Sequence, residues 1–432
     1  MSKKISLPVA IVLMLALVLL TFMTTYTLTS FHYTARLTEA YMEGVQAATG
    51  NELYAKMEKV MELFHDNSIL EWDEDAAADA MLQAYAGATG DLYADYYNAE
   101  EFKALTASNH AETEGIGVSI IDNAEEGAIE IILVYPESPA EEAGLLVGDL
   151  IVAVGIGDNQ KLISDLGYYA AVAELQGKAG TNAEFVVRRN GELIEFSVKR
   201  RSVTAVSVMH HVCETDSTVG VIKITGFDTQ TPVQFDAAME DLIAKGCRSF
   251  IFDVRHNPGG DLLSIKAVLA RFLQPGDVVI RTIYKNNVEN AAVVEPYAAS
   301  SEDYAGCNIT KEDIGKYRGY DMAVLAGPST ASAAELFTSC LKDYGLATVV
   351  GETTFGKGIM QSIIPLSGYG FDGAVKMTVA YYRSALSENY DGVGIAPHIE
   401  IAQDPSLASK NVYKITDAED VQLQRAIKAI RE

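Results

Sequence analysis

Two glycines and a lysine in the stretch "VVGETTFGKG", residues 349–358, have the spacing that opens a phosphate-binding P-loop. A P-loop also needs Ser or Thr directly after the lysine, to hold magnesium, and a helix that begins there. Here Gly358 follows Lys357, and the next residues, "IMQSIIPL", alternate as in a strand. We therefore expect the amine of Lys357 to serve a chemistry other than nucleotide binding.

Ser332 offers a nucleophile for such chemistry. It stands at the start of an expected helix, "SAAELFTSCLKDYG", directly after a strand and the turn "AGPSTA". Unpaired N–H groups and the helix dipole stabilise an oxyanion at such a place, and Ala333 is placed to donate its N–H. Lys357 can take the hydroxyl proton only as a neutral amine, which requires burial to lower its pKa from about 10.4 by roughly three units. The two residues predict a Ser-Lys nucleophile and base, with Gln361 as a hydrogen-bond partner of the amine.

Other roles for the serines remain open. Ser332 and Glu335 also fit a capping box, S-x-x-E, in which the hydroxyl only caps its own helix. Ser329, three residues earlier, is a second candidate nucleophile.

Charged residues and histidines elsewhere leave further alternatives. Asp253 and Arg255, at the end of an expected strand, are either a structural ion pair or part of the site, and His256 beside them would allow a Ser-His-Asp arrangement. His210 and His211 lack the HExxH or carboxylate spacing of a metal site. We expect neither a metal nor another cofactor.

The composition limits the class of protein. The chain has 432 residues, 49% of them hydrophobic, which is enough for two or three domains. Acids outnumber bases 59 to 33, for a net charge of −26, so a nucleic acid is not an expected partner. Four cysteines stand far apart without a CxxC pair, which leaves one or two disulfides open but indicates no zinc site.

The N-terminus predicts a membrane anchor. After Lys3 and Lys4, the apolar run "ISLPVAIVLMLALVLLTFMTTYTLTSF" carries no charge and is long enough to span a bilayer. A cleavable signal peptide is the alternative, but its apolar part would be shorter and followed by a small-x-small site. We expect a single-pass protein of the cell membrane whose catalytic part is extracytoplasmic.

The residues that follow, up to about Lys103, are helical in pattern. Apolar residues recur every three or four positions in "LTEAYMEGVQAATGNELYAKMEKVMELF". We expect a stalk or a homodimer contact here, and nothing catalytic.

From about Glu114 the hydrophobic period changes to two, which indicates strands, and Asn190-Gly191 predicts a type I′ hairpin turn. The motifs "GIGV", "ESPAEEAGLLVGDLIVAVG" and "LQGKAGT", in this order, resemble a PDZ domain. The resemblance implies that a peptide adds as a strand and that its C-terminal carboxylate binds the backbone of Gly115, Ile116, Gly117 and Val118. The alternative is that the two glycines only serve a tight turn.

Beyond Arg201 strands and helices alternate, as in an α/β domain whose parallel strands end at one rim. Two of these ends carry "DVRHNPGGD" and "AGPSTASAAE".

Together with "STASAAELFTSCLKDYGLATVVGETTFGKGIMQ" and "GVGIAPHIEI", these motifs resemble the carboxyl-terminal processing peptidases, or tail-specific proteases, of the S41 serine peptidase family. The resemblance covers nearly everything after about residue 70. It implies a membrane-anchored endopeptidase that recognises free C-terminal tails of proteins or peptides through its PDZ domain. An anchored PDZ adaptor that binds tails without cutting them is the alternative.

The resemblance also assigns roles. It makes Ser332 the nucleophile, Lys357 the general base and Gln361 its orienting partner, and it places the oxyanion N–H groups at Gly259 or Gly260 and at Ala333. His256 replaces a common asparagine and His398 a usual aspartate, which affects substrate details more than catalysis.

The expected fold is an α/β peptidase core with a small, mainly-β PDZ domain, an N-terminal helical region and one transmembrane helix. The expected boundaries are a cytoplasmic N-terminus at 1–4, the anchor at 5–28, the helical region at 29–105, the PDZ domain at 106–200 and the peptidase core at 201–432.

Overall fold

The computed structural model describes residues 52–432, except 110, 124 and 408–409. The chain forms two compact units, residues 1–78 and 79–432. The first contributes α2 (Glu52–Asn67) to the described part, and α3 (Glu74–Ala88) runs across the boundary. Helix α4 (Ala99–Asn109) begins directly after Asn98.

The fold class needs one correction, because the transmembrane helix is not supported. In the described part of the chain, no helix combines the length and apolar character that crossing a membrane requires. The 16-residue α2, for example, carries charged side chains along its length and is shorter than the roughly 20 apolar residues of a span. The segments predicted as cytoplasmic residues and anchor, 1–4 and 5–28, lie outside the described residues.

The small domain is a sheet closed on one side by short helices. Its strands, in the spatial order β3-β4-β5-β7-β8, are antiparallel neighbours, and β6 pairs with β5. Two short helices, α6 and α7, follow β6 and are separated at Gly167, whose φ is +80°. The bounds are β3 (Val118–Asn123), β4 (Ala128–Val134), α5 (Pro139–Glu142), β5 (Leu150–Val154), β6 (Lys161–Leu162), α6 (Ile163–Leu166), α7 (Tyr168–Leu175), β7 (Asn182–Arg189) and β8 (Glu192–Lys199).

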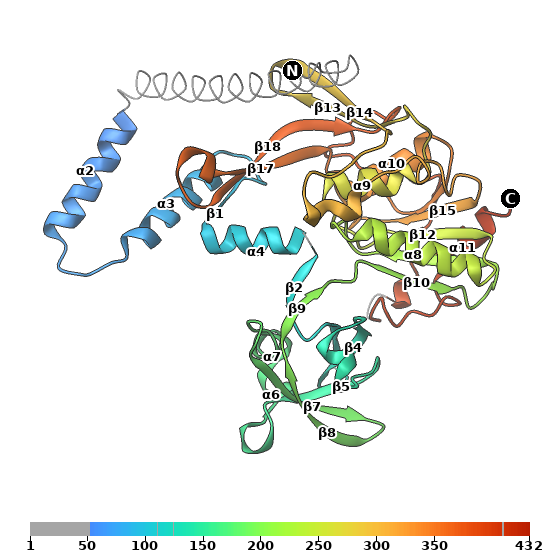
Figure 1. Ribbon diagram of the computed structural model, residues 1–432, viewed down its shortest axis with the longest axis horizontal. Helices are drawn as coiled ribbons and strands as arrows, with labels where there is room; N and C mark the ends of the chain where they lie inside the picture. Colours follow the sequence, from blue (N-terminus) through green and yellow to red (C-terminus); the bar gives the residue numbers. More distant parts are fainter. Residues whose placement is uncertain (1–51, 110, 124, 408–409) are drawn as a thin grey trace, which may run out of the picture. The chain divides into compact units, whose positions relative to one another are not determined.

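The predicted hairpin turn is confirmed, since Asn190 and Gly191 both have positive φ angles, +52° and +86°, between β7 and β8. A two-stranded ribbon of β2 (Glu112–Gly115) and β9 (Arg201–Thr204) connects this domain to the rest of the chain (Figure 1).

The α/β pattern after Arg201 forms a six-stranded sheet in the order β10-β11-β12-β15-β16-β19, parallel except for β10. Side chains of each central strand alternate between two buried clusters, so both faces of the sheet are covered. Helices α8, α9 and α10 pack on one face and α11 on the other. The bounds are β10 (Val208–Val212), β11 (Val219–Ile224), α8 (Thr231–Ala244), β12 (Ser249–Asp253), α9 (Leu262–Ala270), β15 (Asp321–Ala326), α10 (Ala333–Asp343), β16 (Thr348–Gly351), β19 (Ile399–Glu400) and α11 (Val421–Ala429).

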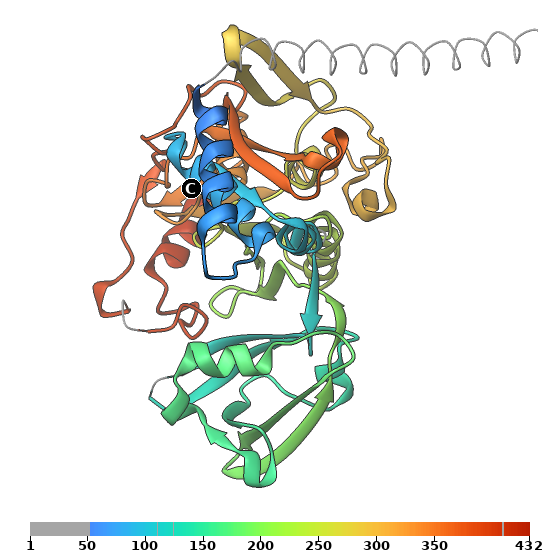
Figure 2. The same cartoon turned by 90° about the vertical axis from the view of Figure 1, so that its left-hand side faces the viewer.

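The peptidase core also contains a second sheet, which is antiparallel. Strands β17 and β18 run together as a hairpin (Figure 1 and Figure 2), and β18 pairs with both β1 and β13. The bounds are β1 (Asp95–Tyr97), β13 (Val278–Tyr284), β14 (Val288–Val293), β17 (Ile359–Pro365) and β18 (Ala374–Arg383). Strand β1 thus brings a segment from before the small domain into the core.

All four cysteines, Cys213, Cys247, Cys307 and Cys340, are buried and free. The disulfides that the sequence left open are not formed.

Replacing Phe252 by alanine tests the packing of the large sheet against its helices. Phe252 is fully buried, and its ring contacts those of Phe235, Phe272 and Phe337. We expect a loss of about 3–5 kcal/mol in the free energy of unfolding, measured in urea by circular dichroism. Phe371→Ala, at a ring that is 67% exposed, is the matched control and should change it by less than about 0.5 kcal/mol. Equal losses for the two variants would contradict this placement.

Candidate active site

Ser332 occupies the turn between β15 and α10, where the chain leaves the large sheet. Its φ of +55° is rare for a residue with a side chain, and such strained strand-to-helix turns hold a nucleophile clear of the backbone. The capping box is present in outline, because the Ser332 N–H donates to Glu335 Oε2 at 2.9 Å. The reciprocal contact of the capping box, from the backbone N–H of Glu335 to the Ser332 side chain, is also present, although it does not have the geometry of a cap hydrogen bond. It lies beside the phenol of Tyr382, whose pKa burial raises and this hydroxyl partly lowers.

Lys357 lies in the loop before β17 and lines the same cavity as Ser332, a space of about 670 Å³. Burial and, second, the neighbouring Lys376 ammonium lower the pKa of the Lys357 amine from its ordinary value, while Glu335 opposes them. Within the described residues the amine has no hydrogen-bond partner, and it lies 4.2 Å from the centroid of the Tyr93 ring. The structure therefore brings the predicted nucleophile and the predicted base to one cavity, without a hydrogen bond between them.

The carboxylate of Glu335 connects Ser332 with Lys357. It is fully buried and accepts four hydrogen bonds. Oε2 accepts the backbone N–H groups of Ser332 (2.9 Å) and Lys357 (2.8 Å), while Oε1 accepts the Thr354 hydroxyl and the Gly356 N–H, both at 2.6 Å. From the sequence we interpreted Glu335 only as a helix cap, because its contacts with residues 354–357 are long-range.

The three predicted oxyanion donors differ in availability. Gly259 donates its N–H to Asn257 Oδ1 at 2.8 Å, and a Cβ at this position would lie 2.7 Å from Ser332 Cβ, so Gly259 serves close packing. The N–H groups of Gly260 and Ala333 have no acceptor in the described part of the chain, and both residues line the cavity. These two are the available donors.

Gln361 lines the cavity too, but it does not bind the amine of Lys357. Its amide donates to Thr378 Oγ1 at 3.2 Å, and Thr378 in turn donates its hydroxyl and its N–H to Asp91.

The sequence did not indicate that residues 91–97 contact the lysines of the candidate site, and we predicted nothing catalytic for this segment. Tyr93 faces the amine of Lys357, and the Tyr97 hydroxyl accepts a hydrogen bond from Lys376 at 2.8 Å. The aromatic run "DLYADYY" indicates that these residues are buried, but it does not indicate which residues they contact.

The alternative nucleophile, Ser329, and the alternative base, His256, do not line the cavity that contains Ser332 and Lys357. Ser329 and His256 line a second cavity of about 310 Å³, to which neither Ser332 nor Lys357 contributes. This geometry does not support a Ser-His-Asp arrangement with Ser332.

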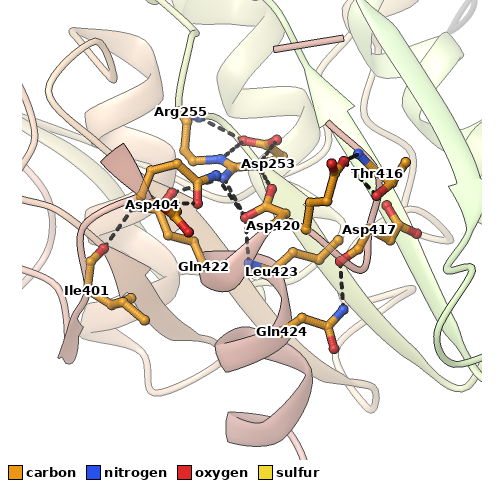
Figure 3. Close-up of polar contacts among 12 residues, drawn as sticks. Asp253, Arg255, Ile401, Asp404, Thr416, Asp417, Asp420, Gln422, Leu423 and Gln424 are labelled. Carbon is orange, nitrogen blue, oxygen red and sulfur yellow. Dashed lines mark hydrogen bonds and ion pairs between the residues drawn. The ribbon is translucent and has the colours of Figure 1, made fainter. Parts of the chain in front are cut away.

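Asp253 and Arg255 belong to a buried ion-pair network. They do not line the cavity around Ser332. Figure 3 shows the Arg255 guanidinium between the carboxylates of Asp253 (2.8 Å) and Asp420 (2.7 Å). Burial alone would raise the pKa of Asp253, but the Arg255 charge outweighs it and holds that pKa well below its usual range. The network ties the start of α11 to the end of β12, from which the loop carrying Gly260 departs.

The other histidines have structural partners. His210 pairs with Asp241 at 2.8 Å and His211 with Asp417 at 3.0 Å, while Nδ1 of His398 accepts the Val349 N–H.

The predicted peptide-binding residues form one end of a groove of about 200 Å³ in the small domain. Gly117 has a φ of +82°, and a Cβ there would lie 2.3 Å from Ser138 Cβ, so only glycine fits. The N–H groups of Ile116 and Gly117 have no acceptor within the described residues. Strand β3 is the edge of its sheet and lies across the groove from α7, which contributes Val172 and Leu175.

Comparisons with known proteins identify the family of this chain. The model of peptidase family S41 matches residues 218–401, and a PDZ domain model matches residues 130–189. A carboxyl-terminal-processing protease from a Synechocystis species is 30% identical over 333 residues, which cover 76% of this chain and 71% of that protein. The chain belongs to peptidase family S41.

Further relatives of this S41 peptidase include the carboxy-terminal processing protease CtpA of Bacillus subtilis, 29% identical over 86% of this chain and 75% of that protein. A putative S41 protease from Bacteroides fragilis has a similar fold, with a TM-score of 0.53 at 17% identity over 84% of this chain and 92% of that one. The chain is thus a serine peptidase of the carboxyl-terminal processing type with a PDZ domain.

Replacing Glu335 by glutamine should disturb both Ser332 and Lys357. An amide has one acceptor oxygen, so its NH₂ group would face two of the four donors that the carboxylate accepts. We expect a loss of about 2–4 kcal/mol in the free energy of unfolding and, in the folded fraction, a kcat/KM roughly tenfold to hundredfold lower. Urea unfolding and peptide hydrolysis measure the two effects, with exposed Glu312→Gln as the control. Wild-type values for Glu335→Gln would show that the carboxylate does not hold the site.

Proposed function

We propose that this S41 peptidase hydrolyses polypeptide chains with Ser332 as the nucleophile and Lys357 as the general base. The observation that carries the proposal is that both residues line one cavity and are bound through their backbones to the same oxygen of Glu335. Burial, Lys376 and the strained turn at Ser332 are the features that activation of a serine by a lysine requires.

In the first step the neutral Lys357 amine takes the proton of the Ser332 hydroxyl while Oγ bonds to the carbonyl carbon of the scissile peptide. The resulting oxyanion is placed to accept hydrogen bonds from the N–H groups of Gly260 and Ala333. The C–N bond then breaks as the Lys357 ammonium returns its proton to the leaving amine. Water hydrolyses the acyl-enzyme, again with Lys357 as base and then as acid, and Ser332 is regenerated.

We further propose that the PDZ domain recognises the free C-terminus of a protein or peptide substrate. The unpaired N–H groups of Ile116 and Gly117 are donors for a carboxylate, and the exposed edge of β3 can accept an added strand. The aliphatic side chains along the groove favour an apolar C-terminal residue. The extracytoplasmic location and the homodimer stay predictions that rest on the N-terminal sequence.

Ser332→Ala and Lys357→Met should each abolish peptide cleavage while the protein stays folded. Loss of a nucleophile removes on the order of 10⁶ in kcat, whereas loss of a helix cap would cost about 1 kcal/mol of stability and leave the activity. Mass spectrometry of peptides incubated with each variant measures cleavage. Ser329→Ala, at the second cavity, is the matched control and should cleave as the wild type does. A wild-type protein that binds tails and cuts none would instead favour the inactive PDZ adaptor.

Amidation of a peptide's C-terminus should weaken its binding at least about tenfold, because the charge-assisted hydrogen bonds to the loop at residues 115–118 are lost. Fluorescence anisotropy on the Ser332→Ala protein, which cannot cleave the probe, measures the affinity. Acetylation of the N-terminus of the same peptide is the control and should leave the affinity unchanged. Equal binding of the free and the amidated peptide would rule out carboxylate recognition.

A further inference from the structure

The amine of Lys357 has an aromatic partner from outside the predicted peptidase core. Its Nζ lies 4.2 Å from the centroid of the Tyr93 ring, and in the described part of the chain the amine donates no hydrogen bond. The face of an aromatic ring attracts an ammonium through the ring quadrupole and has little attraction for a neutral amine. The contact therefore distinguishes between the two protonation states on which the base function depends.

Tyr93 is held in place on both sides. Asp91 accepts the N–H and the hydroxyl of Thr378 at 2.7 and 2.9 Å, and β1 pairs with β18 from Asp95 to Tyr97. The segment 91–97 is thus fastened along β18, and the Tyr93 ring is carried by a backbone fixed at two points.

Several charged or titratable groups surround Lys357. From β18, the Lys376 ammonium repels its charge, and the Tyr382 hydroxyl donates to its backbone oxygen at 2.8 Å. From α10, the Glu335 carboxylate attracts its charge. From the loop after β18, Asp391 accepts the N–H of Gly358 at 3.1 Å. In addition to these groups, the Tyr93 ring contacts the amine of Lys357 and favours the charged form of the amine.

We propose that Tyr93 is a positioning residue that holds the Lys357 ammonium in the resting enzyme and releases the amine to Ser332 once its proton has passed to solvent. This inference rests on the proposed role of Lys357 as general base. It follows that the ring competes with the Ser332 hydroxyl for the amine and sets the pH at which the base becomes available.

The pH dependence of kcat/KM tests this competition. The neutral amine is the active form, so kcat/KM rises with pH through the pKa of Lys357 in the free enzyme. Without the ring the ammonium loses a favourable contact, and in Tyr93→Leu this rise should move to lower pH by about 0.5 unit. Tyr93→Phe keeps the ring face and should follow the wild type. Pentafluorophenylalanine at position 93 has nearly the shape of phenylalanine but a face that no longer attracts cations, and it should shift as leucine does.

The measurements use the full-length protein, a cleavable peptide and, in parallel, labelling of Ser332 by a fluorophosphonate as a function of pH. Tyr85→Leu, at a ring that is 68% exposed, is the control for a general effect of losing a tyrosine. Profiles of Tyr93→Leu and of the fluorinated variant that superimpose on the wild type, or a Tyr93→Phe profile shifted equally, would overturn the inference. Cleavage that persists in Ser332→Ala, or in Lys357→Met with an unchanged pH profile, would refute the proposed function instead. If Tyr93→Leu does not fold, the comparison of phenylalanine with its fluorinated form decides alone.

Discussion

The active site depends on one buried carboxylate. All four partners of Glu335 donate hydrogen bonds to it, so its two oxygens act only as acceptors. A charge without water is costly unless it is fully hydrogen-bonded, and here the donors come from the first residue of the α10 turn and from residues 354–357. The carboxylate therefore holds the backbone of Ser332 relative to that of Lys357, which follows 25 positions later in the sequence.

A second constraint acts on the other side of Ser332. The positive φ of this residue places its backbone against Gly259, where a Cβ would lie 2.7 Å from that of Ser332. Gly259 is held by Asn257, and the loop begins where Arg255 joins β12 to α11. The turn at Ser332 is thus held by Glu335 on one side and packed against Gly259 on the other, and the Arg255 network lies at the start of the loop that carries Gly259.

The sequence predicted those parts of this arrangement that short-range patterns encode. Alternating strands and helices, the Asn190-Gly191 turn and the motifs around Ser332 and Lys357 each occupy a few neighbouring residues, so their local conformation follows from composition and spacing. The roles of Glu335 and Tyr93 did not follow, because hydrophobic periodicity tells that a residue is buried and not what it contacts. The same limit explains why Gln361 was expected beside Lys357: residues on one face of a strand have alternative partners on the next strand, and Thr378 of β18 takes its amide. The transmembrane helix was wrong as part of the fold class, since the described helices do not include one.

Several of these contacts are made by residues of one strand, β18. It carries Lys376 and Thr378, which hold the segment 91–97, and Tyr382, whose hydroxyl binds the backbone of Lys357 and lies beside Ser332. The Tyr93 ring of segment 91–97 lies against the amine of Lys357. The backbones of Ser332 and Lys357 are instead both hydrogen-bonded to Glu335, and Ser332 also packs against Gly259. In the function we propose, the amine of Lys357 is the group through which the region before the PDZ domain contacts the catalytic residues.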